Sequence, residues 1–346
     1  MKKILFTGGG SAGHVTPNIA LIEAIVKSGE ADVCYMGTGG VEKRLIEPIK
    51  IPYYTFDCPK LVRSFSLKNL GIPAAFSRAV KEAKKGLETF RPDVVFSKGG
   101  YVSLPVVVAA HKLSIPCLTH ESDLSAGLAN KLMARKCRHV LTSFPETADK
   151  FKNGKFTGSP IRCNVLSGDK STAKAHYGFD KKSGRKTLLV FGGGSGSQRL
   201  NEILRSHLSA LSEKYDILHL CGSGNAVHAK FRGYKQIEFE TDMGTAYAAA
   251  DLVISRAGSN TVFELLALKK PALLVPLEGQ TRGDQIENAR YFEKKGLIRI
   301  LSQKDGAYLP EAIEDALNDE TLKDNLAVSD FSSGTKNILA EIRALL

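Results

Sequence analysis

Two glycine-rich turns each follow an apolar run of strand length and precede a helical segment. Glycines stand in the first turn at Gly8, Gly9, Gly10 and Gly13, and in the second at Gly192, Gly193, Gly194 and Gly196. A turn without side chains points backbone N–H groups and a helix N-terminus at one spot, which suits phosphate oxygens. The two copies predict two anion-binding α/β domains that face a shared cleft.

The first turn also matches the pattern GxGxxG, through Gly8, Gly10 and Gly13. A nicotinamide dinucleotide site requires an acidic residue at the end of the second strand, where it binds the ribose hydroxyls. Here that strand ends in MGTGG (36–40), and no Asp or Glu occurs before Glu42. A dinucleotide site is therefore the minor alternative.

Candidate bases lie close to the first turn and at the end of a later strand. His14 follows Gly13, and a histidine beside a phosphate site can accept the proton of an attacking hydroxyl; the alternative is a histidine that caps or packs the turn. Glu121 and Asp123 follow an apolar run, where polar groups of an open α/β sheet face the ligand crevice. Helix capping by Asp123 or Ser125 is the alternative there.

The second half contains a matching group of polar residues. Arg256 follows a strand, and Ser259, Asn260 and Thr261 open a helix whose hydroxyls and amides can meet a diphosphate. Glu264, one turn on, is well placed for ribose hydroxyls, although an acid in a first helical turn needs no ligand. Asp284 and Gln285, on the loop after another strand, offer the adjacent acceptor and donor groups that sugar hydroxyls require.

Strand-length apolar runs alternate with longer helical stretches. The expected strands are 4–7, 33–36, 94–97, 116–119, 139–142, 187–191, 217–221, 236–239, 252–255 and 272–276. Continuous apolar runs are typical of strands buried on both faces, so we expect doubly wound parallel sheets. Pro160 and two glycines interrupt the pattern in 157–171, which predicts domains at 1–160 and 161–331. An amphipathic helix, about 332–346, is expected to return to the first domain.

Composition limits the possible partners and compartments. The 346 residues fit roughly two domains, and the net charge of +12 favours an anionic partner, although solubility alone also explains it. The six cysteines lack CxxC or zinc spacing, which favours a reduced cytoplasmic compartment. We expect no signal peptide, because a strand begins at once, and no membrane span, because no apolar run reaches about 18 residues.

One segment, 60–86, mixes apolar and basic residues. Its apolar members are Phe65, Leu67, Leu70, Ile72 and Phe76, and its basic members are Lys60, Arg63, Lys68, Arg78, Lys81, Lys84 and Lys85. This mixture suits peripheral binding to an acidic membrane, and a solvated basic helix is nearly as good an explanation. We expect no nucleic-acid partner, because no zinc finger or RNA-recognition signature occurs.

The order of the motifs resembles the GT-B glycosyltransferases and, within them, the MurG family. The matching segments, which span residues 6–289, are FTGGGSAGHVTP, SKGGYVSLP, HESDLSAGLANK, TGSPIR, FGGGSGSQRLN, DMGTAYAAADLVISRAGSNTVFEL and GDQIENA. The resemblance implies two doubly wound Rossmann-like α/β domains facing a cleft. It also implies transfer of N-acetylglucosamine from UDP-N-acetylglucosamine to the muramyl C4 hydroxyl of lipid I, which forms lipid II in peptidoglycan synthesis.

The resemblance assigns roles to individual residues. The acceptor diphosphate would lie over the first turn, at Gly9, Gly10, Ser11, Ala12, Gly13, His14 and Tyr101. The donor would be bound by Arg162, Gly194, Ser195, Gly196, Met243, Arg256, Ser259, Asn260, Thr261, Glu264, Asp284 and Gln285, with the uracil near Glu240 to Met243. His14 would be the catalytic base, with Glu121 or Asp123 as its rival.

The implied reaction inverts the anomeric centre and needs neither metal nor cofactor. The chain has no Asp-x-Asp pair of the metal-dependent transferases, which agrees with a reaction without metal. The implied partners are UDP-N-acetylglucosamine, lipid I, the anionic cytoplasmic face of the cell membrane and proteins of cell-wall synthesis or division. The chain departs from the commoner family pattern where HESD replaces HEQN, FGGGSGSQ replaces GGSQGA, and GDQ replaces RQQ. A UDP-N-acetylglucosamine 2-epimerase of the same fold and a non-catalytic UDP-sugar sensor are the alternatives.

Overall fold

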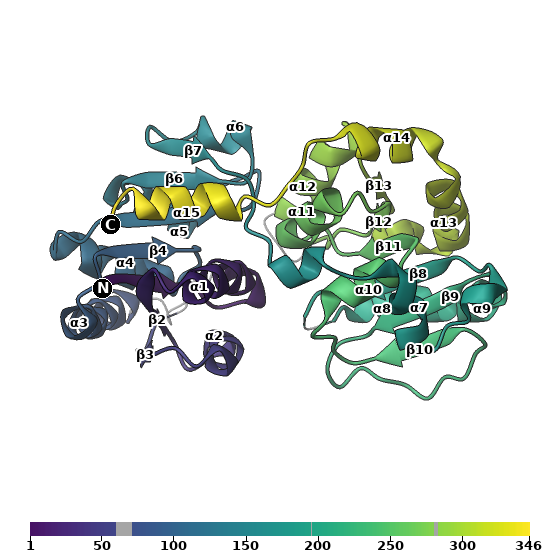
Figure 1. Ribbon diagram of the computed structural model, residues 1–346, viewed down its shortest axis with the longest axis horizontal. Coiled ribbons are helices and arrows are strands. Elements are labelled where there is room, and N and C mark those ends of the chain that lie inside the picture. Colours follow the sequence, from purple (N-terminus) through teal and green to yellow (C-terminus); the bar gives the residue numbers. More distant parts are fainter. Residues whose placement is uncertain (60–70, 195, 280–282) are drawn as a thin grey trace. The chain divides into compact units, whose positions relative to one another are not determined.

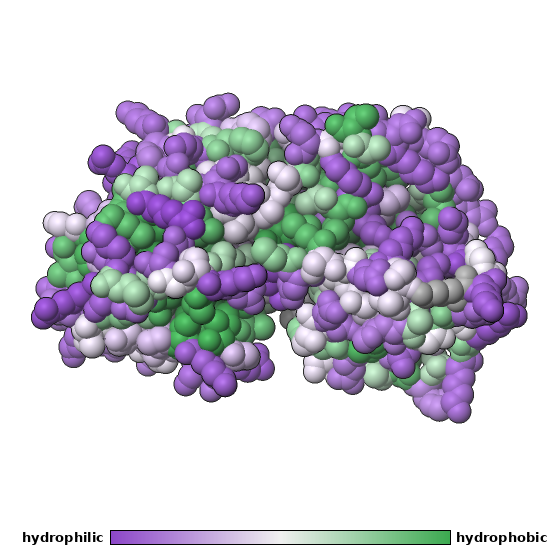
Figure 2. All heavy atoms as spheres, in the orientation of Figure 1, coloured by the Kyte–Doolittle hydropathy of each residue, from purple (hydrophilic) through white to green (hydrophobic). Residues whose placement is uncertain are grey.

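The computed structural model divides the chain into two compact units. It describes residues 1–59, 71–194, 196–279 and 283–346, and for Lys181 the backbone alone. The first unit comprises Met1–Arg162 together with Ser333–Leu346, and the second comprises Cys163–Ser332. On the face drawn in Figure 2 the outer residues are mostly hydrophilic, with smaller groups of hydrophobic residues among them.

The first unit is built on a parallel sheet of seven described strands in the order β3-β2-β1-β4-β5-β6-β7 (Figure 1). The strands are β1 (Lys2–Thr7), β2 (Ala31–Gly37), β3 (Tyr53–Thr55), β4 (Val94–Ser97), β5 (Cys117–Glu121), β6 (His139–Thr142) and β7 (Gly154–Phe156). The helices are α1 (Thr16–Ser28), α2 (Val41–Ile46), α3 (Ile72–Phe90), α4 (Ser103–Lys112), α5 (Leu128–Met133), α6 (Pro145–Ala148) and α15 (Thr335–Arg343).

Helices cover both faces of this sheet, which explains the continuous apolar runs. Ile4 and Phe6 of β1 belong to a core that includes α1, whereas Leu5 points into a second core that includes α3 and α4. Because neighbouring residues of a strand point to opposite faces, both faces need apolar side chains.

The C-terminal helix α15 belongs to the first unit, as the sequence led us to expect. Its buried residues Ile338, Leu339 and Ile342 join the core on the α1 face. Arg343 forms an ion pair with Glu30 (Nε–Oε2 2.8 Å), which adds a contact at the surface.

The second unit has a parallel sheet of six described strands in the order β10-β9-β8-β11-β12-β13 (Figure 1). Its strands are β8 (Thr187–Phe191), β9 (Asp216–Leu220), β10 (Tyr234–Ile237), β11 (Leu252–Ser255), β12 (Ala272–Leu274) and β13 (Arg299–Ile300). Its helices are α7 (Lys170–His176), α8 (Gln198–Ser206), α9 (Leu208–Lys214), α10 (Met243–Ala249), α11 (Ser259–Ala267), α12 (Asp284–Glu293), α13 (Leu309–Asn318) and α14 (Glu320–Val328).

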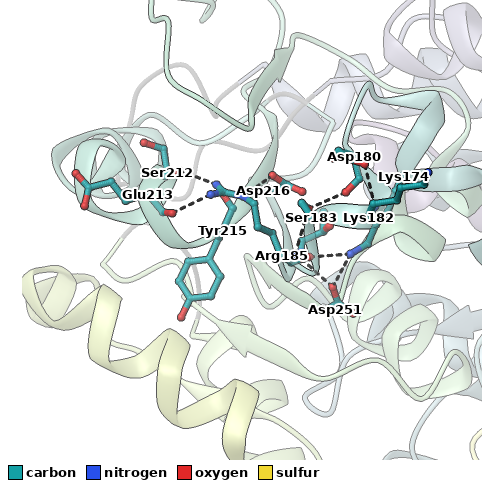
Figure 3. A network of polar contacts seen from close by, with 11 residues as sticks. Lys174, Asp180, Lys182, Ser183, Arg185, Ser212, Glu213, Tyr215, Asp216 and Asp251 are labelled. Carbon is teal, nitrogen blue, oxygen red and sulfur yellow. Dashed lines mark hydrogen bonds and ion pairs between the residues drawn. The ribbon is translucent and has the colours of Figure 1, made fainter.

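An arginine just before β8 stabilises the amino-terminal edge of this sheet (Figure 3). Arg185 Nε donates to Asp216 Oδ1 (2.8 Å), and its two terminal nitrogens donate to backbone carbonyls of Ser212, Glu213 and Tyr215. Lys174 of α7 donates to the Arg185 carbonyl (3.0 Å). The network thus joins α7, the end of α9 and the first residues of β8 and β9 at the edge opposite the glycine-rich turn.

Candidate active site

In each unit the glycine-rich turn lies where the strand order reverses. The first turn follows β1, whose neighbours β2 and β4 lie on opposite sides, and the second follows β8 between β9 and β11. Ligands of open α/β sheets bind at such switch points, beyond the carboxyl ends of the strands. Each unit therefore has its own candidate binding edge.

In the first unit, two glycine turns are interlocked. A Cβ on Gly100, which follows β4, would lie 2.6 Å from the Gly9 carbonyl oxygen and 3.0 Å from His14 Nδ1. A Cβ on Gly10 would lie 2.4 Å from the ring of Tyr101. Close approach of the two loops thus requires glycine at both positions, quite apart from any ligand.

His14 ends a short 3₁₀ helix, Ala12–His14, which also contains Gly13. Its Nδ1 lies 3.0 Å from the hydroxyl oxygen of Ser11, and its side chain is half-buried. The predicted base thus lies at the switch point, beside the turn expected to bind the acceptor diphosphate.

The carboxylate of Glu42 is buried against the first turn, a contact that the sequence did not predict. Its Oε2 accepts from the Gly10 N–H (3.3 Å), and its Oε1 accepts from the Thr38 N–H (2.9 Å). The Glu42 carboxylate therefore already accepts a hydrogen bond from one backbone N–H of the turn. An acceptor diphosphate would have to bind the other N–H groups of the turn.

Glu121, one of the candidate bases, holds its own loop together. Its two oxygens accept hydrogen bonds from the Asp123 N–H (3.1 Å), the Gly127 N–H (2.8 Å) and Asn130 Nδ2 (2.8 Å). These donors favour the ionised carboxylate and fix the loop in place. Capping of α5 by Asp123 or Ser125 was wrong as an alternative, because the N-cap is Gly127.

Lys98, which follows β4 directly, is a site residue that sequence reasoning missed. Its side chain is 2% exposed, and its ammonium donates a hydrogen bond to Ser122 Oγ. Burial lowers the pKa of Lys98 to about 8, although Glu121 and Asp123 act in the opposite direction. Burial and the Lys98 charge together lower the pKa of His120 well below its usual value.

In the second unit, the glycine turn is more open. Gly193 and Gly194 are exposed, and Gly193 has a φ of +88°. Among the described residues, no heavy atom lies within 4 Å of a Cβ built on Gly193, and a Cβ on Gly194 would meet only Phe239, at 3.9 Å. Their backbone therefore faces space that a ligand can fill, unlike the interlocked turn of the first unit. Ser195 lies outside the described residues.

Arg256 contacts the start of the helix that follows this turn, and its guanidinium donates hydrogen bonds to other protein groups. Nε and Nη2 donate to Ser197 Oγ (2.9 and 2.6 Å), Nη1 donates to the carbonyls of Val275 and Pro276, and Nη2 also reaches Gln303 Oε1 (3.1 Å). Ser197 caps α8, the helix that begins at the turn. Arg256 thus joins the start of α8 to the loop after β12; neither Ser197 nor Gln303 was predicted as a partner.

Glu264 lies in the middle of α11 rather than in its first turn, so the explanation as a first-turn acid was wrong. Its Oε2 accepts a hydrogen bond from the hydroxyl of Tyr247 (2.8 Å), which is 1% exposed. Tyr247, a residue the sequence did not single out, also packs edge-on against Phe191 of β8. The hydroxyl of the buried Tyr247 therefore fixes the position of the Glu264 carboxylate.

The helix α11 begins at Ser259, and no described side chain caps it through a hydrogen bond. Asn260 and Thr261 lie in its first turn, where backbone N–H groups and the helix dipole favour an anion. The predicted hydroxyl-bearing residues are thus placed at a helix N-terminus beside the switch point.

The remaining predicted donor residues lie on three further segments. Asp284 and Gln285 form the first turn of α12 and are not on a loop, which corrects the prediction; Gln285 Oε1 accepts from the Leu277 N–H (3.0 Å). Met243 begins α10, and Glu240 just before it accepts from the Tyr177 hydroxyl (3.0 Å). The half-buried Arg162 is the last residue of the first unit's main segment, and Gly196 lies within the second turn.

The described residues form neither a candidate metal site nor a candidate membrane span. They contain no group of three or more His, Cys, Asp or Glu side chains arranged to hold a metal ion. No described helix is both long enough and apolar enough to cross a membrane.

Family models match both halves of the chain. Residues 4–142 match the glycosyltransferase family 28 N-terminal domain, and residues 187–341 match the glycosyltransferase family 28 C-terminal domain. Each match contains one of the two glycine turns.

Curated relatives match the chain along nearly its whole length. A protein of Clostridium perfringens (strain SM101 / Type A) is 41% identical over 351 residues, which cover 99% of this chain and 98% of the relative. One of Clostridium botulinum (strain Langeland / NCTC 10281 / Type F) is 42% identical over 364 residues, 99% of each. Both are named UDP-N-acetylglucosamine--N-acetylmuramyl-(pentapeptide) pyrophosphoryl-undecaprenol N-acetylglucosamine transferase.

Solved structures agree on the fold. The crystal structure of Acinetobacter baumannii MurG matches with a TM-score of 0.75 and 25% identity, covering 99% of this chain and 100% of that one. A UDP-GlcNAc 2-epimerase from Neisseria meningitidis bound to UDP-GlcNAc matches with a TM-score of 0.69. The epimerase is 13% identical to this chain, and the match covers 99% of this chain and 100% of the epimerase. At that identity the likeness concerns the fold alone.

Proposed function

The chain belongs to the MurG family, the N-acetylglucosamine transferases just described, and from this membership we propose that it makes lipid II. It transfers N-acetylglucosamine from UDP-N-acetylglucosamine to the muramyl C4 hydroxyl of lipid I. The observation that carries this proposal is identity of 41% over 99% of the chain, because so long a match includes both binding edges.

In this proposal the donor binds the second unit. The exposed backbone at Gly193 and Gly194 and the start of α11 bind the diphosphate, since both lie at one switch point. Arg256 contributes its charge and holds Ser197, and so it acts mainly by positioning the turn. As the bond to the sugar breaks, these donors stabilise the charge on the departing UDP.

Glu264 binds the ribose hydroxyls in this proposal, because its carboxylate is fixed by Tyr247. The uracil lies near Glu240 and Met243, at the start of α10. Asp284 and Gln285 bind the sugar hydroxyls from the start of α12.

The acceptor binds the first unit, with its diphosphate over the turn Gly8–Gly13 and Tyr101 beside it. His14 removes the proton from the muramyl hydroxyl, and direct attack on the anomeric carbon inverts its configuration. The rival carboxylates are Asp123 and Glu121, whose oxygens accept three N–H donors.

The lipid tail of the acceptor requires contact with a membrane surface, which we place at α3 and the segment before it. Phe76 packs into the core of the first unit, whereas Arg78, Lys81, Lys84 and Lys85 are exposed. An exposed basic face attracts anionic headgroups, which fits a peripheral position on the cytoplasmic side. Residues 60–70 of the predicted segment lie outside the described residues; they include Phe65, Leu67 and Leu70 as well as Lys60, Arg63 and Lys68.

The test combines purified protein, UDP-N-acetylglucosamine labelled in the sugar and a lipid I analogue. Label in the lipid fraction supports the transferase. Free epimerised sugar would instead indicate an epimerase, and binding without product a sensor.

Two variants divide the roles between the units. His14→Ala is expected to reduce turnover and leave UDP affinity unchanged, whereas Glu264→Gln is expected to weaken UDP binding. Unchanged turnover of His14→Ala would remove His14 as the base.

A further inference from the structure

A fully buried cation lies beneath the loops that we assign to the acceptor. Lys98 is 2% exposed, and its Cβ would lie 3.2 Å from a Cβ built on Gly8, so the residue lies directly under the first glycine turn. Its ammonium points toward the loop after β5, where Ser122 Oγ accepts its hydrogen bond. Lys98 therefore joins the ends of β1, β4 and β5 at the switch point.

Burying an ammonium is costly unless it is compensated, so the position of Lys98 calls for an explanation. Glu121, at the end of β5, and Asp123, next to Ser122, interact favourably with the Lys98 charge. Glu121 is already bound by three N–H donors. Asp123 is half-buried and Glu121 is 5% exposed, so Asp123 is the more accessible of the two residues.

We propose that Lys98 is a positioning residue of the acceptor site, where it holds the loop 121–127 through Ser122 and sets the Asp123 carboxylate in place for the lipid-linked acceptor. This inference rests on the proposed function, because it takes the first unit as the acceptor domain. Lys98 is buried, and so it acts through Asp123 rather than by touching the substrate.

The depressed pKa of Lys98 agrees with this role, because perturbed buried groups cluster at functional sites. The titratable groups that interact with its charge are Glu121, Asp123 and His120, all on β5 or the loop after it. Gly8, which faces it from the β1 turn, does not titrate.

The experiment is a steady-state double-mutant cycle with labelled UDP-N-acetylglucosamine and the lipid I analogue. Lys98→Met keeps an unbranched side chain, one atom shorter, and removes its charge, and Asp123→Asn keeps the shape of the carboxylate. We expect each variant to reduce kcat/KM for the acceptor by about 10-fold or more, as for a lost charge-assisted interaction. The double variant should lose no more than the worse single variant.

Two readouts separate positioning from a general structural effect. UDP affinity, which belongs to the other unit, is expected to change less than about 2-fold in every variant. The matched control is Lys112→Met, an exposed lysine at the end of α4 that should behave as the wild type.

The possible failures are distinguishable. If the wild-type protein transfers no label to lipid, the proposed function falls and this inference falls with it. If the wild type is active but Lys98→Met has normal acceptor kinetics, loses UDP affinity equally, or is additive with Asp123→Asn, then only the role of Lys98 is overturned.

Discussion

Replacing Lys98 by methionine should make the first unit more stable at neutral pH. The side chain is buried, and burial lowers the pKa of its ammonium from 10.5 to about 8. At pH 7 Lys98 is charged in both the folded and the unfolded protein, but burial makes the charged form less stable in the folded protein. Removing the charge should therefore raise the free energy of unfolding.

The size of this cost follows from the two pKa values. A difference of one pH unit corresponds to about 1.36 kcal/mol, so a pKa lowered from 10.5 to about 8 costs roughly 3 kcal/mol at pH 7. The folded protein binds fewer protons at Lys98 between pH 8 and 10.5, so the stability advantage of Lys98→Met over the wild type should shrink across that window. The advantage of Lys98→Met is full below pH 8 and nearly gone above pH 10.5.

Buried cysteines allow each unit to be followed separately. Cys34 and Cys117 lie in the first unit, and Cys221 lies in the second. Pulsed alkylation during urea unfolding, read by mass spectrometry, gives the free energy of unfolding from each thiol. The first two should report the gain in Lys98→Met and the third should not, while Lys112→Met serves as the control.

Equal free energies of unfolding for Lys98→Met and the wild type at pH 7, measured from Cys34 and Cys117, would refute this prediction. A difference in free energy between the two proteins that stays constant between pH 8 and 10 would refute it as well. Together with the kinetic cycle, a variant that is more stable yet slower would show that the lysine is kept for function.

Three further variants test the second unit. Tyr247→Phe should weaken UDP binding by about 10-fold and leave binding of 2′,3′-dideoxy-UDP unchanged, because the tyrosine orients Glu264; equal losses by calorimetry would contradict this. Arg256→Lys should weaken UDP binding by about 10-fold or more, since an ammonium cannot reproduce the forked donors that hold Ser197; unchanged affinity by calorimetry would contradict it. Arg185→Met should lower the free energy of unfolding by about 3–5 kcal/mol, measured by alkylation of Cys221, because it leaves the Asp216 carboxylate buried and unpaired (Figure 3); a loss under about 1 kcal/mol would contradict it.

Much of the fold was predictable because buried strands leave a clear pattern. Apolar runs predicted β1, β4 and β8, and the expected GT-B architecture of two Rossmann-like domains is confirmed. The strands missed, β3, β7 and β13, lie at sheet edges and have only two or three residues. So short an edge strand contains no apolar run that a sequence pattern can detect.

The site was less predictable, because its polar contacts form between segments far apart in the chain. Arg256 was singled out, but its contact with Ser197 depends on how two loops meet. Lys98 stands beside the glycines of SKGGY, and that adjacency was the available signal; its burial is a property of the folded sheet. Glu42 was noted only as too distant for a ribose, yet it binds the Gly10 amide.

The central claim is that the second unit binds the nucleotide sugar, which hydrogen exchange can test directly. With saturating UDP-N-acetylglucosamine, mass spectrometry should show slower exchange in peptides containing the turn after β8 and the start of α11. Peptides containing Gly8–His14 should be unchanged. Protection of Gly8–His14 by the nucleotide, with none at the turn after β8, would contradict the account.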